Sequence, residues 1–340
     1  MNSNWHSFLT AQGARFGSEA HELLDFGDAA GELQAARSAT VLAPLTHLGV
    51  IACAGDEAKP FLHNQLTSDI NHLGVEQAQH SAWCTAKGRM LASFVAWRSG
   101  DDYRLALAAE LLPAIIKRLQ MFVLRSKVTL ADISDQIALL GIAGPKAAES
   151  LAAAGLSAPG EAMSVSNNED IRVIRLDTSR YLIALPVERC AALWPVLAAQ
   201  ARPVGLPVWR WLDIVAALPL ITAATREEFV PQMADFEKIG GVSFHKGCYP
   251  GQEIVARTQY LGKVKRHLFR ASSETPVKAG DDLYSPENPD QSIGKIVTAA
   301  VAPEGGWAAL AVIQSNFAAS ARVGSLEGPA IGATPVNPVV

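Results

Sequence analysis

The turn in the middle of SFVAWRSGDDYRLALA constrains the fold of this chain most strongly. Residues 99–102 read SGDD between two apolar runs, and such residues favour a tight connection between antiparallel strands. Helical patterns stand on both sides of this hairpin, in DEAKPFLHNQLTSDI before it and in ELLPAIIKRLQMFVLR after it. An order of strand, helix, hairpin and helix predicts an α+β unit.

The rest of the chain repeats this mixture and then changes. IALLGIAG and YLIALP are typical of strands, whereas PKAAESLAAAG and ERCAALWPVLAAQ are typical of helices, so a second α+β unit follows. From about Arg266, short alternating runs between Gly- and Pro-rich turns predict a small β-barrel or sandwich with little helix. SEAHELLDF is helix-like, and we expect a helical N-terminal segment over residues 1–40.

Composition excludes several classes of protein. With 340 residues, 49% hydrophobic and only 18% charged, the chain is expected to fold into two or three domains. A formal net charge of −4 gives no chain-wide basic excess, so we expect no direct binding of nucleic acid. The eight histidines form no HExxH motif, and we expect no metal site.

Cysteine spacing and apolar runs indicate the compartment. Cys53, Cys84, Cys190 and Cys248 form no CxxC pair, which argues against a zinc ribbon or a redox dithiol. The N-terminus lacks the pattern of a signal peptide, and the longest apolar run, residues 211–224, is too short to span a bilayer. We therefore expect a cytoplasmic protein without a membrane segment.

The densest group of reactive side chains lies in FHKGCYPGQEIVART. This segment brings together Lys246, Cys248, Tyr249, Gln252 and Glu253, between glycines that permit close backbone approach to a ligand. A cation two residues from the thiol would favour the reactive thiolate. The alternative interpretation is a surface turn with a buried, inert cysteine.

Residues 246–253, KGCYPGQE, resemble the K-G-C-Y-x-G-Q-E signature of the YgfZ-type folate-binding proteins, relatives of the T-protein (aminomethyltransferase) of the glycine cleavage system. FLHNQLTSDI, AKGRM and FVPQMADFEKIGGVSF resemble the same family in the same order, and the resemblance runs from about Val41 to the C-terminus. It implies a three-domain, ring-like arrangement with two α+β units and a C-terminal β-barrel. The implied parts are a folate-binding domain (41–130 and 205–262), a second α+β domain (131–204) and a barrel (263–340).

The resemblance also implies a cofactor, tetrahydrofolate or a derivative, and residues to hold it. Cys248 and Lys246 are the catalytic candidates. The folate-binding candidates are Thr67, Asp69, Trp209, Tyr249, Gly251, Gln252, Glu253 and Arg257. For Trp209 core packing is the rival interpretation, and for Thr67 and Asp69 it is ordinary capping. A second aromatic contact of the family falls at Leu48.

Basic residues near the motif have two interpretations. Arg257, Lys263, Lys265, Arg266 and Arg270 could face the glutamate tail of a folate or a polyanionic partner, or they could form a solvated surface. The turn Lys87–Arg89 carries further positive charge.

One departure from the T-protein bears on activity. Where that family has an acidic pair beside the folate, this chain has Ala92 and Ser93, neither of which is an acid or base at neutral pH. Aminomethyl transfer is therefore not expected. The resemblance implies an accessory role in iron–sulfur cluster assembly or repair, with assembly or client proteins as partners, including enzymes that modify tRNA. The alternatives are a folate-dependent one-carbon transferase and a non-catalytic scaffold stabilised by folate.

Overall fold

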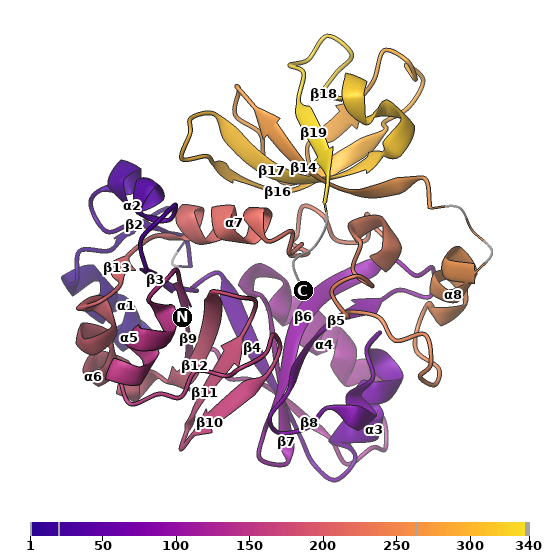
Figure 1. The fold of residues 1–340 in the computed structure, drawn as a ribbon. Coiled ribbons are helices and arrows are strands. Elements are labelled where there is room, and N and C mark those ends of the chain that lie inside the picture. The colour runs from indigo at the N-terminus through magenta and orange to yellow at the C-terminus, as the bar shows by residue number, and fades with distance from the viewer. Residues whose placement is uncertain (1, 20, 261, 263, 337–340) are drawn as a thin grey trace.

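The computed structural model describes residues 2–19, 21–260, 262 and 264–336. In this part of the chain the strands form three larger sheets and a two-stranded ribbon. Figure 1 shows the C-terminal sheet above the other two, with helix α7 (Leu206–Val215) lying between them. The structure is thus a mixed α+β fold, as expected.

The first sheet contains the predicted hairpin and has the antiparallel order β5-β6-β7-β4-β8. Ser99 pairs with Asp102, and Gly100 adopts φ +65°, which a tight turn requires. The strands are β4 (Leu48–Ala54), β5 (Ala78–Cys84), β6 (Met90–Ser99), β7 (Asp102–Ala108) and β8 (Thr129–Asp132). The accompanying helices are α3 (Ala58–Gln65), η1 (Ile70–His72), η2 (Ala109–Leu111) and α4 (Leu112–Val123).

The second sheet has the order β10-β11-β12-β9-β3-β13. Its strands are β3 (Val41–Pro44), β9 (Ile137–Ala143), β10 (Val165–Asn168), β11 (Ile171–Arg175), β12 (Arg180–Pro186) and β13 (Arg202–Pro203). Helices α5 (Ala147–Ala153) and α6 (Val187–Ala198) connect strands of this sheet. Strand β3 pairs here, although its residues fall in the first expected domain, and the expected domain boundaries stay a prediction.

The N-terminal segment differs from the expectation. The described residues of SEAHELLDF, 18, 19 and 21–26, form no helix, and residue 20 lies outside the described residues. Instead, Leu23–Asp25 form β2, which pairs with β1 (Arg15–Phe16), and the helices here are α1 (Ser3–Ala11) and α2 (Ala29–Ala35). Burial alternates along β2, with Leu23 and Asp25 inside. Asp25 accepts a hydrogen bond from Arg15 Nε at 2.5 Å. Pairing with β1, whose residues lie seven to ten positions earlier in the chain, therefore overrides the local helical pattern.

The C-terminal sheet is an antiparallel half-barrel with the order β18-β15-β16-β17-β14-β19, and it curls as Figure 1 shows. Its strands are β14 (Arg266–Ser273), β15 (Asp282–Tyr284), β16 (Gly294–Val301), β17 (Trp307–Gln314), β18 (Arg322–Val323) and β19 (Gly332–Pro335). One 3-10 helix, η4 (Ser315–Ser320), interrupts it, in line with the β-rich prediction.

Helix α7 lies between the second sheet and the C-terminal sheet, because it packs against β3 on one side and against β16 and β17 on another. After it the chain runs through η3 (Pro231–Ala234) to α8 (Gln252–Tyr260), which begins inside the KGCYPGQE segment. Within the described part of the chain, none of the helices combines the length and apolar character that a membrane span requires.

Candidate functional site

Helix α7 places Trp209 and Asp213 on one face, because they are four residues apart. Gly205 in an extended conformation and Pro207 in the first turn begin this helix. The Trp209 side chain packs on Gly141 of β9, where an added Cβ atom would come within 2.4 Å of the indole ring. Glycine at this position therefore makes room for the ring between the helix and the second sheet.

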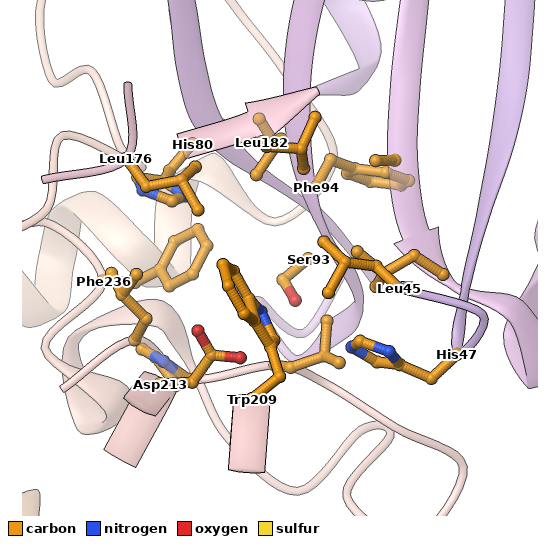
Figure 2. A pocket seen from close by; sticks show the side chains of 16 residues that line it. Leu45, His47, His80, Ser93, Phe94, Leu176, Leu182, Trp209, Asp213 and Phe236 are labelled. Atoms are coloured by element: carbon orange, nitrogen blue, oxygen red, sulfur yellow. The ribbon is translucent and has the colours of Figure 1, made fainter. Parts of the chain in front are cut away.

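A pocket lies beside this face of α7, between the first and second sheets. Figure 2 shows Trp209 and Asp213 at its edge, with Phe94 and Phe236 around the same space. Aliphatic side chains complete the wall: Leu45, Leu48, Val95, Leu176, Leu182, Leu218 and Leu220. An apolar pocket lined by aromatic and aliphatic side chains with a few polar groups is typical of a site for a small organic ligand.

Asp213 is held by a buried guanidinium. Arg180 Nη1 donates to Asp213 Oδ1 at 2.6 Å, and Arg180 Nε donates to Asp177 Oδ2 at 2.6 Å. The guanidinium also lies 5.6 Å from the centre of the Trp209 ring. Burial raises the pKa of Asp213, and the charge of Arg180 opposes that rise. Arg180 thereby favours the ionised carboxylate at the edge of an apolar pocket.

Two histidines and a serine add neutral polar groups to the pocket lining. Burial lowers the pKa of His47 to about 3 and that of His80 to about 4, with Arg210 and Arg180 respectively adding to the shift. Both imidazoles are therefore neutral at pH 7. Ser93 Oγ accepts a hydrogen bond from the backbone N–H of Ile221 at 3.0 Å.

The pocket includes one of the eight folate-binding candidates, Trp209. Leu48, at the position of the family's second aromatic contact, also lines it. Among the described residues that line it, none comes from the KGCYPGQE segment. Trp209 is 2% exposed, so it belongs to the core and to the pocket wall at once.

The Lys246 side chain is buried and caps the C-terminal end of helix α3. Its ammonium group donates to the backbone carbonyls of His63 and Leu66, at the C-terminal end of α3, and lies 4.9 Å from the centre of the Tyr249 ring. Burial lowers the pKa of Lys246 to about 8, and Asp69 partly offsets this. Carbonyl groups at a helix C-terminus carry partial negative charge, so a cation here stabilises the helix end.

Thr67 and Asp69 follow shortly after Leu66, whose carbonyl binds the Lys246 ammonium group. Thr67 Oγ1 donates to the Gly241 carbonyl at 2.6 Å and accepts from the Ala82 N–H at 2.9 Å. Asp69 accepts from the Asn71 N–H at 2.9 Å and begins η1. The structure therefore brings Thr67, Asp69 and Lys246 together around the start of the motif.

Gly251 allows the KGCYPGQE segment to pack closely on the turn between β5 and β6 of the first sheet. It adopts φ +82°, and an added Cβ atom would come within 2.4 Å of the Thr85 carbonyl oxygen and 2.7 Å of the Gly88 Cα atom. Gln252 donates weakly back to the Lys246 carbonyl, with a separation of 3.5 Å. Glu253 and Arg257 follow on α8.

Cys248 differs from the other cysteines in exposure. It is exposed, whereas Cys53, Cys84 and Cys190 are buried. Burial raises the pKa of each of these three thiols to about 12. No group of three or more His, Cys, Asp or Glu side chains suited to a metal ion occurs among the residues described.

Most side chains that line the pocket lie outside the site residues predicted from the sequence. Asp213 carried a usable signal, because it is a lone carboxylate inside the apolar run 211–224. A carboxylate is seldom buried unless it is paired with a cation or accepts hydrogen bonds. His47, His80 and Phe236 come from three separate segments and offer no local signal.

Comparison with known proteins agrees with this architecture. Residues 5–206 match the model of the GCVT N-terminal domain. A glycine cleavage system aminomethyltransferase T from Bartonella henselae has the same fold, with a TM-score of 0.79 and 21% identity over 98% of this chain and 96% of its own. The fold and the pocket thus define a T-protein-like molecule.

Closer similarity in sequence is found to proteins named tRNA-modifying protein YgfZ. The one from Sodalis glossinidius is 30% identical over 302 residues, which is 88% of this chain and 92% of that protein. The one from Yersinia pseudotuberculosis is 32% identical over 247 residues, covering 71% and 74% respectively. The chain belongs to the YgfZ family of GCVT-domain proteins.

Proposed function

We propose that this chain is a cytoplasmic tetrahydrofolate-binding accessory protein for the assembly or repair of iron–sulfur clusters, and that it supports iron–sulfur enzymes, including those that modify tRNA. The pocket beside Trp209 and Asp213 carries this proposal, because its shape and polarity suit the ligand. The link to tRNA comes from the YgfZ relatives, which are named tRNA-modifying proteins. The iron–sulfur link rests on the KGCYPGQE resemblance, with the exposed Cys248 as the group available to a client or assembly protein.

The pocket residues fit a reduced folate. The flat pterin needs an apolar slot, which Trp209, Phe94 and Phe236 provide. Its amino-pyrimidinone edge presents N–H donors, for which the carboxylate of Asp213 is a suitable acceptor. When bound, the folate would supply a carrier of one-carbon units.

Folate binding without aminomethyl transfer is favoured by the lining near β6. Ala92 is fully buried in that strand, and the Ser93 hydroxyl is already bonded to the backbone of the Ile221 segment. Asp213 is a carboxylate in the pocket, but its charge is engaged by Arg180. Ser93 and Asp213 line the pocket and would orient a ligand, whereas Ala92 lies outside the lining. None of the three supplies a free general acid or base.

Titration with tetrahydrofolate and 5-formyltetrahydrofolate tests the proposal. Trp209→Leu should weaken binding by about 5- to 150-fold, because the indole covers one side of the slot. Isothermal titration calorimetry measures this without relying on tryptophan fluorescence. Trp194→Leu is the matched control, since Trp194 is equally buried but lies in the core under the second sheet. Equal affinity of wild type and folded Trp209→Leu, or no binding of either folate, would reject the pocket assignment.

Cys248 should be the cysteine that iodoacetamide labels first, because the other three thiols are buried and hold their protons more tightly. Mass spectrometry after timed labelling gives the order directly. Cys248→Ser should leave stability nearly unchanged while the activity of iron–sulfur enzymes falls in cells that depend on this protein. Full activity with the serine variant would instead favour the non-catalytic scaffold, and Cys190→Ser serves as the control substitution.

A further inference from the structure

A second cavity, here called the basic cleft, lies between α8, the turn before β6 and the start of β14. It shares no lining residue with the pocket beside Trp209. Val230, Met233 and Ile254 give it an apolar floor. Four cations surround this floor: Lys87, Arg89, Lys265 and Arg266.

The charge of the basic cleft is not neutralised by neighbouring carboxylates at contact distance. Within the described residues, the ion pairs of the structure include none of the four cations. Burial lowers the pKa of Arg266, and the nearby Arg89 lowers it further, while Glu228 and Asp282 act in the opposite direction. Two guanidinium groups that repel each other in this way would both be stabilised by an anion between them.

Both arginines are fixed in position by the backbone. Arg89 Nη1 donates to the Glu228 carbonyl, and Arg266 Nη2 donates to the Ser292 carbonyl at 2.9 Å. A guanidinium has five N–H donors, so each retains several for a ligand. Lys87 and Lys265 are exposed beside them. Such a site is pre-organised for phosphate oxygens, which accept hydrogen bonds from several donors at once.

We propose that the basic cleft binds single-stranded RNA, with phosphates on the four cations and a base on the apolar floor. Exposed bases have flat faces that pack on apolar side chains, while the chain of phosphates follows the positive charge. Thr258 and the Gln314 amide also line the cleft and offer polar groups for a ribose 2′-hydroxyl.

An extended acidic peptide is a poorer fit to the same cleft. Such peptides commonly add a strand to an open sheet edge. Here β17 pairs with β14 along its whole length and β19 pairs with its residues 269–272. At the start of β6, Met90 pairs with β5 on one side and bonds to the backbone of Glu227 and Phe229 on the other. The chain's negative net charge limits binding over the whole surface, but it does not prevent binding at a local group of four cations.

Fluorescence anisotropy with a labelled 12-nucleotide RNA and the full chain tests this proposal. The variant Lys87→Ala/Lys265→Ala should bind at least about tenfold more weakly than wild type. Its slope of log affinity against log salt should be smaller by about 1.4, because each phosphate contact on a single strand contributes roughly 0.7. The control Lys59→Ala/Lys117→Ala removes the same charge from exposed sites outside the cleft and should bind like wild type.

Three outcomes would overturn the proposal. The first is no measurable RNA binding at low salt, and the second is an equal loss in the two double variants. The third is competition by a decaglutamate peptide, or by DNA of the same sequence, that matches competition by unlabelled RNA. Affinity for tetrahydropteroate, which lacks the glutamate tail of folate, should be the same in all three proteins, because the basic cleft and the pocket beside Trp209 share no lining residue.

Discussion

Replacing Arg180 by leucine should lower the free energy of unfolding by about 3–5 kcal/mol and remove most of the folate affinity. Arg180 is 3% exposed and bonds Asp177 and Asp213 at 2.6 Å each. Without it, two carboxylates lose their common counter-charge in an apolar environment. Asp213 would then take up a proton, because burial already raises its pKa, and a protonated carboxyl is a poorer acceptor for the pterin edge.

Urea denaturation and calorimetric titration measure the two effects. Arg189→Leu is the matched control, because Arg189 forms its ion pairs with Glu169 and Asp170 at the surface, with 46% of its side chain exposed. An exposed pair of this kind contributes about 0–1 kcal/mol. Arg180→Leu/Asp213→Asn should recover part of the stability, since it removes one unpaired charge, but none of the folate affinity. Equal stability of the Arg180 and Arg189 variants would contradict the argument.

The sequence predicts those parts of the fold that depend on local patterns. Turn residues define the β6–β7 hairpin, and helical periodicity predicts α3 and α4. The same reasoning is wrong for SEAHELLDF, because the pairing of β2 with β1 and the burial of Leu23 outweigh a helix-like composition. Local periodicity carries no information about such a partner.

The candidate site is likewise predictable only where it depends on a local sequence pattern. The KGCYPGQE segment is recognisable from the sequence. The carbonyl groups that bind Lys246 are not, because His63 and Leu66 lie 183 and 180 residues before it in the chain. A role of Lys246 in activating Cys248 therefore stays a prediction. The structure adds a second role, because Lys246 caps the C-terminal end of α3. Likewise, Arg180, the group that favours ionisation of Asp213, is 33 residues away in the chain.

The pocket histidines lead to the second large effect, which is a loss of stability in acid. His47 and His80 are 8% and 9% exposed, and burial lowers their pKa values to about 3 and about 4. In the unfolded chain a histidine has a pKa of about 6.5. Between these values the unfolded chain binds protons that the folded protein does not bind. The histidines therefore favour the folded state fully above about pH 6.5, and this contribution is lost as the pH falls.

Each histidine should contribute a slope of about 1.4 kcal/mol per pH unit below pH 6.5, so the two together could cost roughly 5 kcal/mol at pH 4.5. Urea denaturation of wild type and of His47→Gln/His80→Gln, from pH 7.5 to 4.5, measures the difference. The glutamine variant should lose much less stability over this range, because glutamine takes up no proton. His245→Gln, at an exposed position, is the control and should keep the wild-type slope.

The comparison of slopes separates the histidines from the carboxyl groups of the protein. Burial raises the pKa values of Asp213 and Glu237, and such groups act in the opposite direction, favouring the folded state as the pH falls. Both carboxyl groups are present in every variant, so their contribution cancels in the difference between wild type and the glutamine variant. If the free energy of unfolding varies equally with pH in these two proteins, the imidazoles take up protons in the folded state. The pocket would then be hydrated well enough to hold a charged imidazole.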